Sequence, residues 1–250
     1  MGLSHTALNQ QVARKFAVAD AVHPDDHIYN FVLGHPGFNN DEGRVNYYFN
    51  DGSRSATQFL GLVKKYVDVG GKPKVFEFAS GYGCVTRHLV KAGDIDLESC
   101  DIHPQAVAFL RNEIGATAVQ SASIPEMLAP NGLYDVVFAL SFFSHMPITT
   151  WARWLVRLCE ITKPGGIVVF TTQGRHSMKF VGCEALPESG FWFKAASEQS
   201  DIPVEEYGLT VISPELVKKH IHTIAGVEIL AADEAAWWGH QDLFVVHKSS

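Results

Sequence analysis

Apolar positions along most of this chain follow two alternating patterns. Between residues 74 and 172, apolar runs of strand length are separated by stretches whose apolar positions recur with helical spacing. The run at 134–140 is nearly continuous, as is typical of a parallel strand covered on both faces. This alternation predicts an α/β fold, doubly wound around a mostly parallel sheet. The expected strands lie at 74–79, 97–102, 117–120, 134–140 and 167–172.

Helices are expected between these strands, bounded by residues that start or stop a helix. Gly70-Gly71 and Gly93 are stop signals, and Pro104 is favoured in a first helical turn. Ser213 can cap the N-terminus of a late helix. The expected helices cover about 54–68, 84–92, 104–115 and 149–162, with another beginning after Ser213.

The two remaining segments lack this pattern. Residues 1–50 are polar and irregular, and residues 175–210 are rich in Phe, Trp, Glu and Ser. Strands near 226–231 and 242–247 are joined by a connection too short for a crossover helix, so they should be antiparallel. We therefore expect one domain over 1–250 with a seven-stranded sheet whose last strand is antiparallel. Residues 1–50 would form an N-terminal cap, and 175–210 a lid over the substrate.

Composition excludes several classes of function. The formal charge of −7 disfavours a nucleic-acid partner, because phosphate binding needs clustered Lys and Arg. The four cysteines form no CxxC pair, and His220 and His222 do not share a helix face, so no metal site is expected. Without a signal peptide or an apolar run long enough to span a membrane, we expect a cytoplasmic protein with no membrane partner.

The most informative chemistry follows the first strand. Glu77 ends an apolar run, a small-residue loop with Gly81 and Gly83 follows, and a helical stretch begins directly after it. Asp101 closes the next strand, 18 residues past Gly83. Glycines let a backbone approach a flat ligand, and an acid about 20 residues on can accept hydrogen bonds from a ribose. The spacing therefore predicts a nucleoside cofactor.

Two such cofactors compete. A dinucleotide places its pyrophosphate at the helix N-terminus, and there the carboxylate of Glu77 would repel it. The third glycine of the dinucleotide fingerprint is also replaced by Thr86. S-adenosylmethionine carries an ammonium and a sulfonium and no phosphate, so a nearby carboxylate favours it. An NAD(P)-dependent oxidoreductase remains the alternative enzyme.

Between Tyr47 and His247 the chain resembles the class I S-adenosylmethionine-dependent methyltransferases. The loop Glu77-Phe-Ala-Ser-Gly-Tyr-Gly83 is similar to the family's acid-x-Gly-x-Gly-x-Gly loop, with Ala79 in place of the first glycine. The resemblance implies that Glu77 orients the methionine ammonium and Asp101 binds the ribose. It also places Gln120, Ser121 and Ala122 near the adenine, although Gln120 and Ser121 could simply be loop residues. The implied cofactor site comprises Tyr48, Glu77, Ala79, Ser80, Gly81, Gly83, Asp101, Ile102, Gln120, Ser121, Ala122, Leu140 and Ser141.

Finer features resemble a bacterial small-molecule subgroup of that family. They are the segments 48–52, 140–147, 171–174 and 239–242. One departure is Gln173, where members of the subgroup often carry His. An Asn-Pro-Pro-aromatic segment, the clamp of base and glutamine N-methyltransferases, is absent after the fourth strand, which disfavours DNA methylation.

His145 follows the fourth strand at the end of the sheet where ligands bind, and imidazole can accept a proton near neutral pH. We therefore assign His145 as the candidate catalytic base, with stabilisation of the next helix as the alternative. His176 and His240 are weaker candidates, and the aromatic residues 191–193 and 237–238 either line the acceptor pocket or pack the core.

The sequence thus predicts methyl transfer from S-adenosylmethionine to a small-molecule acceptor, at oxygen more than nitrogen. A non-catalytic S-adenosylmethionine-binding subunit is the second alternative. The oligomeric state stays open, with a homodimer as one option.

Overall fold

A computed structural model describes residues 4–196, 199 and 202–249. Seven strands form one sheet in the order β3-β2-β1-β4-β5-β9-β8, and β6 and β7 form a separate pair. This confirms the doubly wound, mostly parallel fold with its antiparallel last strand. The chain divides after Ser121 into two compact units. The expectation of a single domain stays a prediction.

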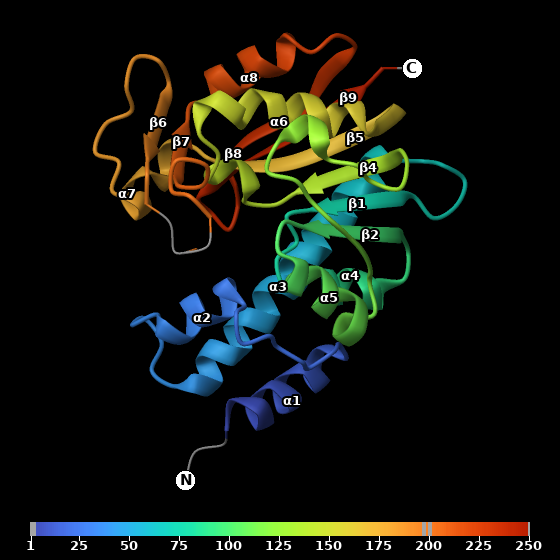
Figure 1. Ribbon diagram of the computed structural model, residues 1–250, viewed down its shortest axis with the longest axis vertical. Helices are drawn as coiled ribbons and strands as arrows, with labels where there is room; N and C mark the ends of the chain where they lie inside the picture. Colours follow the sequence, from blue (N-terminus) through green and yellow to red (C-terminus); the bar gives the residue numbers. More distant parts are fainter. Residues whose placement is uncertain (1–3, 197–198, 200–201, 250) are drawn as a thin grey trace. The chain divides into compact units, whose positions relative to one another are not determined.

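The first 50 residues are not irregular, and that prediction is wrong. They form α1 (His5–Phe16), α2 (His27–Gly34) and the start of α3 (Asp41–Tyr66). In Figure 1 both shorter helices lie beside α3. The sequence is polar here because each helix buries only a narrow stripe, and its N-terminus is capped by a polar side chain. These caps are Ser4, Asp26 and Asn40.

The rest of the N-terminal unit follows the predicted pattern. Strands β1 (Lys74–Phe78), β2 (Asp96–Asp101) and β3 (Thr117–Gln120) pair in parallel. Helix α4 (Thr86–Ala92) ends at Gly93, whose φ of +70° is left-handed as expected for a glycine cap. Helix α5 (Pro104–Phe109) continues as one π-helical turn, Leu110–Ile114.

The C-terminal unit holds the other four strands of the large sheet. Strands β4 (Tyr134–Ala139) and β5 (Thr162–Gln173) are parallel, whereas β9 (Gln241–Lys248) runs antiparallel to both β5 and β8 (Val227–Trp237). Helices α6 (Ile148–Glu160) and α8 (Pro214–His222) lie between strands in the sequence. Ser213 caps α8 as predicted, accepting a hydrogen bond from the amide of Leu216.

Residues 175–210 contain regular structure that their sequence did not predict. A short turn of helix, η4 (Arg175–Ser177), leads into α7 (Met178–Val181). Strands β6 (Phe191–Lys194) and β7 (Leu209–Ile212) then pair antiparallel (Figure 1). Single helical turns also form at Pro125–Met127 (η2) and Phe142–Ser144 (η3). In the described part of the chain, no helix combines the length and apolar character that crossing a membrane requires.

Candidate active site

The glycine loop turns the end of β1 sharply into α4. Ala79, Gly81 and Gly83 all have left-handed backbone conformations, with φ of +57°, +56° and +82°. A Cβ added to Gly81 would meet no heavy atom within 4 Å, whereas one on Gly83 would lie 2.9 Å from Leu110. The Gly81 face is therefore open to a ligand, and Gly83 is needed for packing. Ala79 holds a conformation that glycine adopts at lower cost.

Glu77 lies at the start of this loop with 3% of its surface exposed. Its Oε2 accepts hydrogen bonds from the hydroxyls of Thr86 and Ser99, at 2.7 and 2.8 Å. Burial raises the pKa of Glu77 to about 7, and the negative charge of Asp101 adds to the effect. A cationic ligand group beside this carboxyl would favour its charged form.

Asp101 connects three segments at the end of β2. Its Oδ2 accepts a hydrogen bond from the Gly81 amide at 2.8 Å, and its Oδ1 accepts one from the His103 amide at 3.0 Å. The amide of Ser121 donates to the Asp101 carbonyl at 2.8 Å. At the end of β3 the exposed Gln120 donates from its side chain to the carbonyl of Ile102. The structure therefore brings Gly81 and Ser121 to Asp101 and links Gln120 to the neighbouring Ile102.

Tyr48 is the exception within this unit, because it lies in a buried polar network and is only 1% exposed. Its hydroxyl donates to Oδ2 of Asp26 at 2.6 Å and accepts from Nη2 of Arg87 at 3.2 Å. Arg87 also donates to the carbonyls of Ala19 and Ala21. This arrangement is packing of the N-terminal segment, and the contact of Tyr48 with a cofactor stays a prediction.

In the C-terminal unit, Ser141 occupies a strained position directly after β4, with a φ of +58°. Its amide donates to the Thr171 hydroxyl at 2.8 Å, and its own hydroxyl lies 2.9 Å from that of Ser144. Gln241 donates to the Ser141 hydroxyl and accepts from Thr171, at 2.9 and 2.7 Å. This network fixes the conformation of the loop after β4.

Sequence reasoning identified Ser141 but missed Thr171, Ser144 and Gln241 as its partners. Gln241 lies 100 residues further along the chain, and no local pattern connects the two positions. The only signal was the pair of short segments, 171–174 and 239–242, that resemble the methyltransferase subgroup.

His145 is held in a defined orientation by the segment predicted to be a lid. Its Nδ1 lies 2.8 Å from the carbonyl oxygen of Gly208, and its ring stacks on Tyr207 at 4.4 Å with an interplanar angle of 4°. A carbonyl oxygen can only accept, so Nδ1 carries the proton and the lone pair of the neutral ring is on Nε2. This is the tautomer that a base acting through Nε2 needs.

The weaker candidates lie elsewhere in the same unit. His240 stacks on Trp238, with ring centroids 6.0 Å apart, and burial lowers the pKa of His240. Trp237 is fully buried against Phe138, so it belongs to the core. His176 is exposed and lies beside two carboxylates, those of Glu234 and Asp242.

Comparison with known proteins agrees with the observed fold. Residues 75–166 match the family model described as a methyltransferase domain. The N-methyltransferase NodS from Bradyrhizobium japonicum, solved with S-adenosylhomocysteine, shares the fold with a TM-score of 0.55 and 14% identity, covering 97% of this chain and 99% of that one. Residues 75–166 are thus similar to a methyltransferase domain, and the described chain has the fold of solved S-adenosylmethionine-dependent methyltransferases.

Two further comparisons give other methyltransferases to which the chain is similar. The 1,6-didemethyltoxoflavin-N1-methyltransferase from Burkholderia thailandensis has a TM-score of 0.56 at 14% identity, covering 93% of this chain and 94% of that one. A ubiquinone biosynthesis O-methyltransferase from Rhodopseudomonas palustris is 29% identical over 101 residues, or 39% of this chain. The chain spans about a third of that relative's length, since the match covers 35% of it.

The residues around the glycine loop fit S-adenosylmethionine, and several of the similar structures were solved with this cofactor or with S-adenosylhomocysteine. S-adenosylmethionine presents an ammonium and a ribose diol, and the N-terminal unit offers two buried carboxylates, Glu77 and Asp101. Gly81 lies between these two residues in the sequence. Its open face leaves room for a ligand to lie against the backbone. A dinucleotide would instead bring phosphates to buried acids, which the charges oppose.

Proposed function

We propose that this protein transfers the methyl group of S-adenosylmethionine to a small-molecule acceptor, and that the methylated atom is oxygen. The observation that carries the proposal is the pair of buried carboxylates, Glu77 and Asp101, at the ends of neighbouring strands and on either side of the glycine loop in the sequence. The similarity of residues 75–166 to a methyltransferase domain supports this function over that of a nicotinamide oxidoreductase.

Each half of the cofactor has a proposed partner in the N-terminal unit. Glu77 binds the methionine ammonium, and the resulting charge pair restores the ionised form of its carboxyl group. Asp101 accepts hydrogen bonds from the ribose hydroxyls, and the loop from Ala79 to Gly83 follows the contour of the nucleoside. Gln120, Ser121 and Ala122 contact the adenine edge, while Leu140 and Ser141 are assigned to the methionine end.

When bound, S-adenosylmethionine supplies an electrophilic methyl group on a sulfonium, so positioning can provide most of the rate enhancement. A hydroxyl acceptor must also lose its proton, and we assign that proton to Nε2 of His145. The bond between His145 Nδ1 and Gly208 supports this role, because it leaves the basic lone pair on Nε2. An oriented base matters more for a hydroxyl than for a neutral amine, which favours oxygen.

Binding is the first test of the proposal. We expect S-adenosylhomocysteine to bind with micromolar affinity in calorimetry, and Asp101→Asn to weaken it at least tenfold. Asp96→Asn, at the exposed beginning of the same strand, should leave the affinity unchanged. Failure of the wild-type protein to bind at high micromolar concentrations contradicts the proposal.

Turnover is the second test, and it separates an enzyme from a subunit that only holds the cofactor. The protein is incubated with methyl-labelled S-adenosylmethionine and a small-molecule extract, and mass spectrometry detects products that are heavier by one labelled methyl group. Release of the label as methanol on mild base treatment identifies a methyl ester, and the NMR chemical shift of the labelled methyl group distinguishes a methyl ether from an N-methyl product. Label on an amine nitrogen contradicts the oxygen assignment, and tight cofactor binding without any product supports the non-catalytic alternative.

A further inference from the structure

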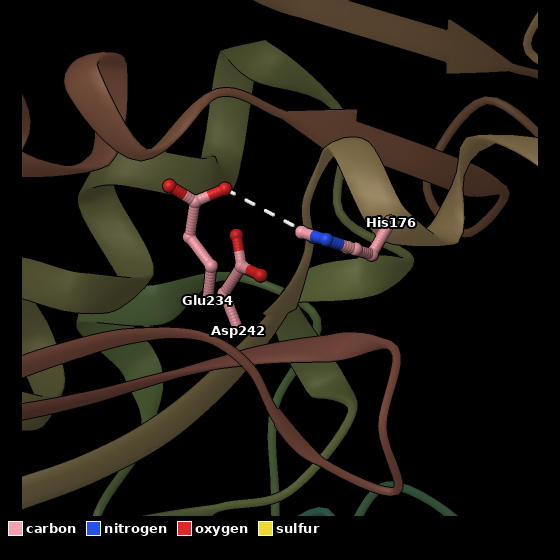
Figure 2. A group of neighbouring side chains, drawn as sticks. All are labelled: His176, Glu234 and Asp242. Atoms are coloured by element: carbon pink, nitrogen blue, oxygen red, sulfur yellow. Dashed lines mark ion pairs between the residues drawn. The ribbon is translucent and has the colours of Figure 1, made fainter.

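Three side chains with metal-binding chemistry meet in the C-terminal unit. They are His176 in η4, Glu234 in β8 and Asp242 in β9, and Figure 2 shows that they come from three different segments. One ligand atom from each lies within 4.8 Å of the others. Nδ1 of His176 is 4.0 Å from the carboxylate of Glu234.

Asp242 distinguishes this group from an ordinary surface cluster, because its side chain is only 1% exposed. Oδ1 accepts a hydrogen bond from the amide of Ala235 at 2.9 Å. Oδ2 is buried and has no hydrogen-bond partner among the residues that the structure describes. A buried carboxylate oxygen without a partner is costly, so a further ligand for it is expected.

The backbone around Asp242 is arranged to leave room for its carboxylate. A Cβ on Gly174 would overlap Oδ2 of Asp242, so only glycine allows β5 to end where it does. Gly174 and Asp242 close the two segments, 171–174 and 239–242, that stood out in the sequence. The structure therefore unites both segments at this carboxylate, away from the hydrogen bonds that Gln241 makes to Ser141 and Thr171.

We propose that His176, Glu234 and Asp242 bind a divalent transition-metal cation. One imidazole nitrogen and two carboxylates suit Zn²⁺ or Mn²⁺, whereas Mg²⁺ and Ca²⁺ prefer oxygen ligands alone. Ligand atoms about 2.1 Å from one ion lie roughly 3–4 Å apart, so only small rotations are needed. The side chains of His176 and Glu234 are 57% and 46% exposed, so they can make these rotations.

The local charges are compatible with a cation. Arg175 is the nearest guanidinium in the sequence, and it pairs with Glu215 at 2.8 Å. The bound ion would join the segment after β5 to the β8–β9 pair and leave its remaining coordination positions to water. This inference does not depend on the methyltransferase chemistry.

The same two strands provide a matched control. His247 and Glu228 form a pair at 2.9 Å, also between β9 and β8, and no third metal-binding group completes a cluster with them among the described residues. If exposed histidine–glutamate pairs bound metal by themselves, both sites would do so. The proposed site requires the third ligand, Asp242.

The test uses the full-length protein after removal of metal by a chelator, without any affinity tag that contains histidine. Zn²⁺ alone is titrated by calorimetry against wild type, His176→Ala, Glu234→Gln and His247→Ala. We expect one site in the wild type, at least tenfold weaker binding in the first two variants, and no change in His247→Ala. Co²⁺ added in place of Zn²⁺ should give visible absorption that His176→Ala loses.

Three results would overturn the proposal: no stoichiometric Zn²⁺ binding up to about millimolar concentrations, equal binding by His176→Ala, or an equal loss in His247→Ala. The last would mean that the chain's 12 histidines bind the ion non-specifically. Asp242→Asn keeps the size of the buried group, and a folded Asp242→Asn protein should bind as weakly as His176→Ala.

Discussion

The amide of Gly81 donates a hydrogen bond to Oδ2 of Asp101 across 2.8 Å. The carboxylate that we assign to the ribose therefore also holds the loop that must approach the nucleoside. A ribose hydroxyl that donates to Oδ2 of Asp101 would replace or share the hydrogen bond from Gly81. The conformation of the loop and the recognition of the ribose therefore depend on the same oxygen atom. Substitution of either residue should change the affinity for the cofactor even in variants that still fold.

Alanine substitution at the two loop glycines should separate binding from stability. Gly81→Ala places a methyl group in open space with left-handed strain of about 1 kcal/mol, so the protein should fold but bind S-adenosylhomocysteine at least tenfold more weakly. Gly83→Ala adds contact with Leu110 to that strain and should lower the free energy of unfolding by about 2–3 kcal/mol. Urea denaturation and calorimetry measure both quantities. Equal loss of stability in the two variants would contradict the assignment of an open face to Gly81.

Cofactor affinity should depend on pH through Glu77. Its folded pKa of about 7 lies above the ordinary value of 4.5, so the free folded protein holds a proton that the unfolded chain releases between these values. Stability therefore falls as pH rises from 4.5 to 7, by up to about 3 kcal/mol from this group. A bound ammonium favours the carboxylate, so affinity should rise over the upper part of the same range and level off above pH 7.

Calorimetry of S-adenosylhomocysteine at pH 5.5, 6.5 and 7.5 checks this dependence, and buffers of different ionisation enthalpy count the released protons. Glu77→Gln is the control, because an amide cannot titrate. Its affinity should be low and flat over this range. A pH dependence that survives in Glu77→Gln would assign the proton to another group.

Two adjacent tyrosines should respond very differently to loss of the hydroxyl. Tyr48→Phe removes the hydrogen bond to buried Asp26 and should lower the free energy of unfolding by about 1–3 kcal/mol. Tyr47 is 45% exposed, and Tyr47→Phe should change stability by less than about 0.5 kcal/mol. Denaturant titration compares the two. Tenfold weaker cofactor binding by a folded Tyr48→Phe protein would instead support the direct contact that the family resemblance implies.

Replacing the proposed base should affect the chemical step alone. Asparagine at position 145 can still donate to the Gly208 carbonyl but has no basic nitrogen, so His145→Asn should lower kcat by about 10²–10³-fold with unchanged affinity for S-adenosylhomocysteine. His240→Asn removes another partly buried histidine of the same unit and should retain turnover within twofold. Full activity of His145→Asn on an identified hydroxyl acceptor would exclude the base.

The sequence predicted the central strands because their apolar runs are long and bounded by glycine and proline, as at Gly93 and Pro104. The sequence did not predict α1 and α2, because each helix buries only a few apolar residues. These residues form a recognisable face only once the helix packs against α3. At the site, Glu77 and Asp101 were predictable because each ends a strand next to the loop. The partners of Ser141 and the convergence on Asp242 depend on strand pairing between distant segments, which no local spacing encodes.

The contacts of Arg87 bear on how this protein can be shortened for study. Its guanidinium donates to the carbonyls of Gly83, Ala19 and Ala21, so residues far upstream of the recognisable family segment complete the neighbourhood of the nucleoside loop. A protein trimmed to begin near residue 70 would keep every residue of the glycine loop. It would lose the carbonyls of Ala19 and Ala21, so the Arg87 guanidinium would no longer have these acceptors. Expression designs based on the boundaries of the matched domain alone would therefore remove partners of Arg87, and Ala19 and Ala21 belong in any minimal version.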